Sequence, residues 1–291
     1  MPSSPLHPLV LEWYASHARD LPWRRADRDP WGVLVSEVML QQTPVDRVVP
    51  AWSAWLERWP TPAALASDSP GEAVRSWARL GYPRRALRLH AAAADCVARF
   101  EGRVPSTYDD LRSLPGVGDY TAAAVLAFAY GRRAVVLDTN VRRVLARLVD
   151  GTEFPRPSVT SAERTTAAGV LPDDDVTAST WSVAVMELGA LVCTAAAPSC
   201  VVCPVRSRCA WVAAGRPAYD GPARPVQRFA GTDRQVRGRL MAVLREAHQP
   251  VAKAELDAVW AEPVQRERAL DSLVADGLVD PRHDGTFALP D

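Results

Sequence analysis

Apolar residues recur every three to four positions along most of the chain, a period that predicts α-helices. The pattern is clear in the segments 31–42 and 45–59, where valine, leucine and tryptophan repeat at this spacing. Further helices are predicted at residues 9–18, 83–100, 120–130, 141–149, 161–170 and 178–192. Alanine is abundant and runs of β-branched residues are short, which also favours helix over strand. The sequence therefore predicts an all-α protein.

The C-terminal residues 233–291 have a second pattern. Three helical periods, at 234–246, 253–260 and 264–276, precede the stretch GLVDPRHDGTFALP. In that stretch Asp284 and Gly285 lie between apolar residues, which predicts the turn of a β-hairpin. Three helices and a hairpin are typical of a small winged-helix-like module. The proline-, glycine- and arginine-rich segment 216–232 is predicted to be its linker.

The charge balance restricts how this protein can bind nucleic acid. The 34 basic residues equal the 34 acidic residues, so a nucleic-acid surface would require segregated charges. Only one basic residue, Lys253, is a lysine. No apolar run is long enough to span a membrane, and the N-terminus lacks the basic region and cleavage pattern of a signal peptide. We therefore expect a cytoplasmic protein with no membrane partner.

The stretch from residue 114 to 140 contains two helix starts with candidate chemistry. The first follows the motif LPGVG, which comprises Leu114, Pro115, Gly116, Val117 and Gly118. A helix that opens after Gly-x-Gly directs free backbone N–H groups and a positive dipole at an anion such as a DNA phosphate. A plain turn between two packed helices is the alternative, and the motif alone leaves it open.

The second helix start has Asp138 at its expected N-cap, followed by Thr139, Asn140 and the helical pattern VRRVLARL. An N-cap position favours the charged form of a carboxylate. A purely structural cap is the alternative, and both roles can hold at once.

Four of the five cysteines form a cluster near the end of the predicted helical region. They are Cys193, Cys200, Cys203 and Cys209, separated by six, two and five residues. Four thiolates at this density can hold an iron–sulfur cluster or zinc, although zinc sites usually have two short CxxC-like hooks and this chain has one. The fifth, Cys96, lies in an alanine-rich helix and is predicted to be a core residue.

Together these motifs resemble the endonuclease III superfamily of helix-hairpin-helix DNA glycosylases. LPGVG followed by VLDTNVRRV looks like its helix-hairpin-helix and catalytic aspartate, and the cysteine spacing resembles its [4Fe-4S] signature. SEVMLQQT at 36–43 is similar to the signature of the adenine DNA glycosylases (MutY type) within that superfamily. LPWR at 21–24, LGYPRRALRLH at 80–90 and MELGALVC at 186–193 support the resemblance, which covers residues 9 to about 212.

The resemblance implies a helix-hairpin-helix glycosylase fold, with a six-helix barrel domain and an iron–sulfur cluster domain, to which the winged-helix-like module is added. The expected parts are an N-terminal segment packing with the iron–sulfur domain (1–29), the barrel with its helix-hairpin-helix (30–135), the iron–sulfur domain (136–215), the linker (216–232) and the module (233–291). The larger Nudix-like domain that usually ends such proteins is not expected here, because the tail after residue 232 is too short and has another pattern.

By the same resemblance, Glu37 is the general acid and Asp138 the carboxylate that stabilises a positive sugar. Glu37 lies among apolar residues of a predicted helix, where partial desolvation would raise its pKa and keep it protonated. A solvent-facing glutamate is the alternative. Asn140 is expected to orient Asp138 or the water. Bifunctional relatives have a lysine where this chain has Tyr120, so strand cleavage is not expected and Tyr120 is assigned to the sugar region.

The resemblance also assigns residues to DNA and to the base. The predicted DNA-binding residues are Gln41, Gln42, Thr43, Tyr82, Arg84, Leu114, Gly116, Val117 and Gly118, and the predicted base-pocket residues are Trp23, Arg24, Leu40, Val183 and Met186. Tyr82 matches an intercalating tyrosine, and Arg84, Arg85 and Arg88 are expected to form a basic edge. Val183 departs from the family, in which many members have a glutamate or glutamine that contacts adenine.

The expected function is therefore removal of adenine mispaired with 8-oxoguanine or guanine from double-stranded DNA, by a monomeric, nucleoid-associated enzyme with a [4Fe-4S] cluster. Two alternatives stay open. One is a mismatch glycosylase for thymine or uracil opposite guanine, because such relatives also have tyrosine at the position of Tyr120. The other is a non-catalytic iron–sulfur DNA-binding regulator, which the presence of both carboxylates disfavours.

Overall fold

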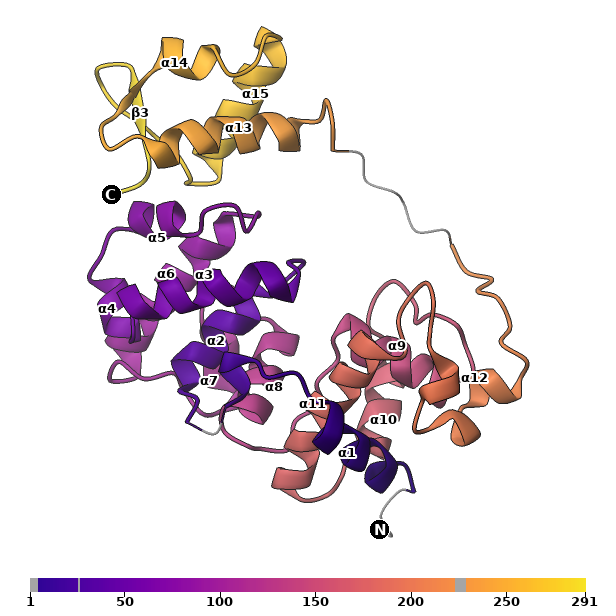
Figure 1. The fold of residues 1–291 in the computed structure, drawn as a ribbon. Helices are drawn as coiled ribbons and strands as arrows, with labels where there is room; N and C mark the ends of the chain where they lie inside the picture. Colours follow the sequence, from indigo (N-terminus) through magenta and orange to yellow (C-terminus); the bar gives the residue numbers. More distant parts are fainter. Residues whose placement is uncertain (1–4, 26, 223–228) are drawn as a thin grey trace. The chain divides into compact units, whose positions relative to one another are not determined.

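The computed structural model describes residues 5–25, 27–222 and 229–291 (Figure 1). Its longer helices are α1 (Leu6–His17), α2 (Pro30–Met39), α3 (Val45–Arg58), α6 (Arg84–Arg99), α8 (Asp119–Phe128), α9 (Thr139–Leu148), α10 (Ser161–Val170), α11 (Asp175–Leu191), α13 (Asp233–Glu246) and α15 (Pro263–Ala275). Shorter helices are η1 (Pro22–Arg24), α4 (Pro62–Ala66), α5 (Pro70–Ser76), α7 (Tyr108–Ser113), η2 (Cys200–Val202), η3 (Arg206–Arg208), α12 (Ala210–Ala213) and α14 (Lys253–Asp257). The predicted all-α class is confirmed. No helix in the described part of the chain has the length and apolar character needed to cross a membrane.

Most predicted helices begin and end within three residues of those observed, but several short elements were not predicted, among them the helices α4 and α12 and one strand. The strand β1 (Val251–Ala252) pairs antiparallel with β3 (Thr286–Ala288), which also pairs with β2 (Asp280–Pro281) in the sheet order β1-β3-β2. The predicted hairpin with Asp284 and Gly285 at its turn is confirmed. A strand of two residues has no period to detect, and β1 exists because the hairpin offers it a partner.

Contacts divide the chain into two compact units. The first contains Met1–Val33, Ser106–Arg112 and Val117–Ala223. Within it α1, α8 and α9 pack against α11, and the core includes Val10 and Trp13 of α1, Leu148 of α9 and Leu188 of α11. Helix α8 thus contacts α11, although the predicted boundaries separate these two helices. The predicted five-part division of the chain stays a prediction.

The second unit contains Leu34–Pro105, Ser113–Gly116 and Arg224–Asp291. Helices α4 and α5 pack on α6, and three buried indoles meet edge-to-face. Their ring centroids are 4.6 Å apart for Trp55 and Trp59 and 5.5 Å apart for Trp55 and Trp77. Helix α5 has a side-chain N-cap, because the Ser69 hydroxyl accepts a hydrogen bond from the Glu72 N–H at 3.2 Å.

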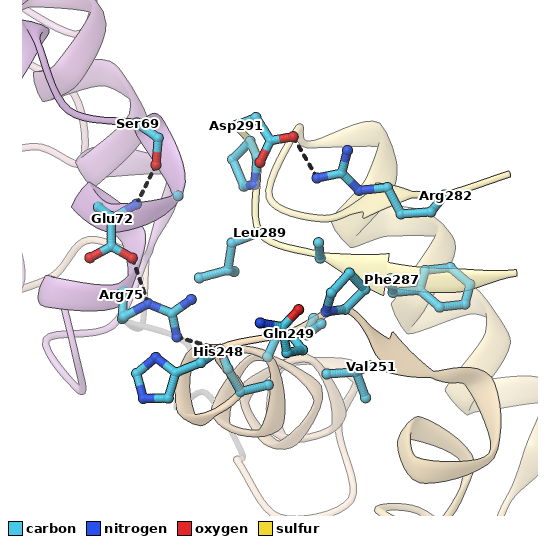
Figure 2. Close-up of a pocket in the computed structure, with 16 residues that line it drawn as sticks. Ser69, Glu72, Arg75, His248, Gln249, Val251, Arg282, Phe287, Leu289 and Asp291 are labelled. Carbon is cyan, nitrogen blue, oxygen red and sulfur yellow. Dashed lines mark hydrogen bonds and ion pairs between the residues drawn. The ribbon is translucent and has the colours of Figure 1, made fainter. Parts of the chain in front are cut away.

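The winged-helix-like module belongs to this second unit and is fastened to α5. The Gly71 N–H donates to the Pro290 carbonyl at 2.7 Å, and a Cβ at Gly71 would lie 2.4 Å from that oxygen, so only glycine fits. Arg75 donates to the carbonyls of Arg245 and Ala247. A cavity of about 300 Å³ lies along this contact, where Arg75 and Leu289 face each other (Figure 2). The module therefore has a specific docking contact on α5.

Candidate active site

Asp138 caps α9 with its side chain, as predicted. Its Oδ1 accepts the Val141 N–H at 2.6 Å, and its Oδ2 accepts Asn140 Nδ2 at 2.8 Å. Both carboxylate oxygens therefore have a fixed donor on the first turn of the helix. The expectation that Asn140 orients Asp138 is consistent with this geometry.

Arg143 holds Asn140 in turn, and sequence reasoning missed it. Its Nη2 donates to Asn140 Oδ1 at 2.7 Å and to the Gly189 carbonyl at 2.7 Å, and its Nε donates to the Cys193 carbonyl at 2.8 Å. Because residues three apart share a helix face, the spacing of Asn140 and Arg143 was an available signal. A continuous hydrogen-bond chain thus runs from the start of the cysteine segment to the Asp138 carboxylate.

The electrostatics of Asp138 differ from the expectation for an exposed cap. Burial raises the pKa of Asp138, while hydrogen bonds from Val141 and Asn140 and the charge of Arg143 oppose that rise. The N-cap hydrogen bond stabilises the charged form of Asp138 and lowers its pKa. Desolvation has the larger effect, so the pKa is raised overall. A desolvated carboxylate interacts more strongly with a nearby positive charge than one in water does.

Glu37 lies on α2, in the second unit, and its residue surface is only 4% exposed. Its neighbours Val35, Val38 and Met39 are buried as well. The burial predicted for this glutamate is therefore present, and the solvent-facing alternative is wrong. That Glu37 is held protonated stays a prediction.

The segment after Glu37 is organised by one buried guanidinium. Arg85 Nη1 donates to the carbonyls of Val38, Met39 and Gln41 at 2.9, 2.9 and 2.6 Å. Its Nη2 donates to Thr43 Oγ1 at 3.0 Å and to the carbonyls of Leu80 and Gly81 at 3.3 and 2.9 Å. Burial lowers the pKa of Arg85 to about 10. Arg85 therefore joins the end of α2 to the turn that carries Tyr82.

Two DNA assignments of the sequence change as a result. Arg85 was expected on a basic edge with Arg84 and Arg88, but it is buried and all its hydrogen bonds go to protein oxygens. Thr43 is buried too, and its hydroxyl donates to the Leu80 carbonyl at 3.3 Å. In contrast, Gln42 is exposed. Its backbone φ is positive, at 56°, and the φ of Tyr82 is also positive, at 48°. The side chain of Leu40 and that of Gln41 are half-buried.

The LPGVG motif presents backbone rather than side chains. Leu114 and Val117 are buried, so a DNA contact by either would have to use its main chain. Gly116 has a φ of 79°, and a Cβ there would lie 2.8 Å from Arg88 Cβ. Gly118 is the exposed N-cap of α8. These features fit the predicted phosphate contact, which stays a prediction.

Of the predicted base-pocket residues in the first unit, Val183 and Met186 lie on α11. Trp23 is buried, and Val183, Met186 and Tyr120 are half-buried. Met186 and Tyr120 pack against the same small apolar cluster. Arg24 differs from the expectation, because its Nη1 lies 2.9 Å from Glu187 Oε2 in an ion pair.

Glu187 is a second residue that sequence reasoning missed. It is fully buried and also accepts Arg19 Nε at 2.7 Å, and these arginines help to hold its pKa below the usual range although burial opposes them. The sequence contains a signal for its burial, because Glu187 is the one acidic residue within the apolar stretch MELGALVC.

The four clustered cysteines line one cavity of about 20 Å³. The fully buried Arg147 borders it, with Nη1 3.4 Å from Cys193 Sγ and its guanidinium carbon 4.7 Å from the Trp211 ring centroid. Burial raises the pKa of Cys203 to about 11, and a bound metal would reverse that effect. Among the residues described, no three His, Cys, Asp or Glu side chains converge on a single-ion site. Cys96 is buried in α6, as predicted.

Gly189 is where α11 comes closest to Asn140, and it yields a first prediction. A Cβ there would lie 2.7 Å from Asn140 Cβ and 2.9 Å from the Asn140 carbonyl oxygen, so the two helices would have to separate. We expect Gly189→Ala to lower the free energy of unfolding by about 1–3 kcal/mol, measured by denaturant titration. Gly169→Ala is the matched control, because nothing lies within 4 Å of its Cβ position and alanine favours helix. Equal stability of the two variants would contradict the predicted clash.

The chain is similar to known DNA repair proteins. Residues 35–167 match the family described as "HhH-GPD superfamily base excision DNA repair protein". An adenine DNA glycosylase of Mycolicibacterium smegmatis is 54% identical over 281 residues, 96% of this chain and 94% of that protein. One from Mycobacterium tuberculosis is 52% identical over 97% of this chain and 92% of that protein.

Among solved structures, a thermostable thymine-DNA glycosylase matches with a TM-score of 0.65 and 25% identity, over 72% of this chain and 95% of that one. The similarity to the mycobacterial proteins covers 96–97% of the chain and so extends into the C-terminal module. The chain belongs to the adenine DNA glycosylases of the HhH-GPD base excision repair superfamily.

Proposed function

We propose that this protein is a monofunctional glycosylase that removes adenine opposite 8-oxoguanine or guanine from duplex DNA. The observation that carries the proposal is the pair of carboxyl groups with different surroundings. Glu37 is almost fully buried within α2, whereas Asp138 is the N-cap of α9 and has fixed donors to both oxygens. Two carboxyl groups in unlike environments can divide the roles of acid and charge stabiliser.

In the proposed reaction the flipped adenine receives a proton from Glu37, and the bond between adenine and the sugar C1′ breaks. The electron pair of that bond leaves with the base, and the positive charge left on the sugar is stabilised by Asp138. Water then adds to C1′ and loses a proton, which restores the acid. Tyr120 is proposed to position the sugar, and Met186 and Val183 to border the base.

The reaction is expected to stop at the abasic site because the chain's one lysine side chain is not free to attack the sugar. Lys253, the only lysine, lies in the C-terminal module with Nζ 2.5 Å from Asp257 Oδ1 and 2.6 Å from Glu267 Oε1. Two carboxylates hold its ammonium charged, and a protonated amine is not a nucleophile. Strand breaks are therefore expected only after alkali treatment.

We further propose that Cys193, Cys200, Cys203 and Cys209 hold a [4Fe-4S] cluster. Support comes from thiols that line one cavity and from the buried cation Arg147, which would offset the negative charge of a thiolate cluster. When bound, the cluster would cross-link the segment 193–209 and hold the Cys193 carbonyl that accepts from Arg143. A brown protein with broad visible absorbance is expected, and a colourless, zinc-loaded one would contradict this assignment. We propose that the enzyme acts as a cytoplasmic, nucleoid-associated monomer.

The test is single-turnover base release from duplexes that contain 8-oxoguanine:A, G:A, G:T or G:U. Adenine release from the first two, with strand breaks only after alkali, would support the proposal. Release from G:T or G:U alone would favour the mismatch alternative, to which Val183 and the similarity to a thymine-DNA glycosylase point. Binding of these duplexes without release of any base would favour the alternative of a non-catalytic DNA-binding regulator.

Replacing the proposed acid gives a second prediction. We expect Glu37→Gln to slow adenine release by about 10²–10⁴-fold, because the amide cannot donate a proton of comparable acidity. DNA affinity should stay near that of the parent protein, because the side chain is buried and of the same shape. A rate within a few-fold of the parent rate would remove Glu37 from the mechanism.

A further inference from the structure

The C-terminal module does not have the charge distribution of an independent DNA-binding domain. Residues 233–291 contain eleven acidic and eight basic residues. Winged-helix proteins place a helix or hairpin on DNA, yet the cations of α15 and the hairpin are paired within the module. Arg266 lies 2.9 Å from Asp257, Arg268 2.7 Å from Asp233 and Arg282 2.6 Å from Asp291.

One cation of the module is used differently. Arg234, on the first turn of α13, is exposed, and its guanidinium carbon lies 4.8 Å from the centroid of the Tyr82 ring and 5.8 Å from that of Phe229. No ion pair involves Arg234 within the described parts of the chain. Its neighbour Asp233 is bound by Arg268 and by Gln265 Nε2 at 3.0 Å, so that carboxylate is directed to α15 instead.

The two aromatic rings beside Arg234 are also exposed. Tyr82 is 39% and Phe229 is 55% exposed. Tyr82 stands on a turn with φ values of 83° at Gly81 and 48° at its own position, and the guanidinium carbon of the buried Arg85 lies 5.6 Å from its ring centroid. The Tyr82 ring is thus contacted by two arginines, the buried Arg85 of α6 and the exposed Arg234 of the module.

The module is held in this place by contacts apart from Arg234. Asp276 of α15 lies 3.1 Å from Arg84 of α6 and 2.6 Å from Arg237 of α13. The contacts of Gly71 and Arg75 at the α5 cavity add to these (Figure 2). Removing the Arg234 guanidinium should therefore leave the module docked.

We infer that Tyr82, Phe229 and Arg234 form one DNA-contacting surface, built jointly by the α6 region and the C-terminal module, in which Arg234 binds a backbone phosphate. Exposed aromatic rings stack on bases, and arginine binds phosphate while stacking on a ring. Tyr82 is the residue predicted to intercalate, so this surface would extend the interface at which the base pair is opened. The inference rests on the proposed function for the identity of that duplex.

The test compares Arg234→Ala with Arg239→Ala in the full chain. Both changes remove one exposed positive charge from α13, but Arg239 contacts the Trp260 ring within the module. Binding to an 8-oxoguanine:A duplex and to an undamaged duplex would be measured at several salt concentrations. We expect Arg234→Ala to weaken both affinities about 5- to 10-fold and to reduce the salt slope by about 0.9, the value of one phosphate contact. Arg239→Ala should change both affinities less than twofold.

The variant Phe229→Ser provides an independent test, because the Phe229 side chain is exposed and contributes little to the core. A loss of about fivefold or more in affinity is expected if the ring stacks on a base. Affinities equal to those of Arg239→Ala would overturn the inference. Tighter binding by Arg234→Ala would also overturn it and would mean that Arg234 shields Tyr82 in the free enzyme. A parent protein that binds these duplexes without adenine release would reject the proposed function but not this surface.

Discussion

Replacing Asp138 with asparagine is expected to slow single-turnover adenine release by about a thousandfold or more while the protein stays folded. Asparagine is as good an N-cap as aspartate and has the same shape, so its Oδ1 can still accept the Val141 N–H. The negative charge that would face the sugar cation is lost. The measurement is the rate of base release from an 8-oxoguanine:A duplex with enzyme in excess.

The stability of the same variant should depend on pH in a defined direction. Because burial raises the pKa of Asp138 above its unfolded value, the ionised carboxylate costs folding free energy at pH values above the unfolded pKa of about 3.9. Asparagine avoids this cost. The melting temperature of Asp138→Asn relative to the parent protein should therefore rise as the pH increases from about 4 to 7.

Asp174→Asn is the matched control, because Asp174 is also an N-cap, with Oδ1 accepting the Thr177 N–H at 2.8 Å. That hydrogen bond lowers the pKa of Asp174, so its carboxylate contributes stability above the unfolded pKa and loses it as the pH falls. The relative melting temperature of Asp174→Asn should change with the opposite sign. If Asp138→Asn melts far below the parent protein at neutral pH, its inactivity would reflect misfolding rather than lost charge.

The parts of the site that the sequence predicts are local in the chain. The N-cap at Asp138 and its bond to Asn140 depend on residues two or three apart, so the pattern DTNV is enough to predict them. The same holds for the turn of the hairpin at Asp284 and Gly285. The ends of helices were predicted less accurately, because α2 ends at Met39 and not at the predicted Gln42. Arg85, a residue of another helix, binds the carbonyls at that end.

The contacts that were missed join segments far apart in the chain. Arg143 reaches Gly189, and Glu187 pairs with Arg19 and Arg24, across separations that no local pattern encodes. Arg85 was placed on an edge with its arginine neighbours because of its charge. Its position in the helical period indicates otherwise, because Leu89 and Cys96 follow it at four and eleven residues and both are buried. Periodicity was the better guide at this position, and charge the worse one.

Replacing Arg85 with methionine should therefore have the largest effect on stability. We expect the free energy of unfolding to fall by about 3 kcal/mol or more, because several carbonyl oxygens would lose the charged donor that Arg85 supplies. Base release should also fall, by about a hundredfold, since the end of α2 after Glu37 and the turn of Tyr82 would no longer be held together. Urea titration and single-turnover kinetics at a temperature where the variant is folded would measure the two effects.

Arg88→Met separates this role from the loss of a positive charge on α6. Arg88 is exposed, and methionine keeps the methylene groups that pack on Gly116, so its stability should change by less than about 0.5 kcal/mol. Arg85→Lys should be intermediate, because a single ammonium cannot reach acceptors on both sides as the planar fork does. Similar losses in Arg88→Met and Arg85→Met would mean that charge alone matters. A greater loss in Arg85→Met than in Arg85→Lys, with Arg88→Met unchanged, would identify the fork as the link between α2 and Tyr82.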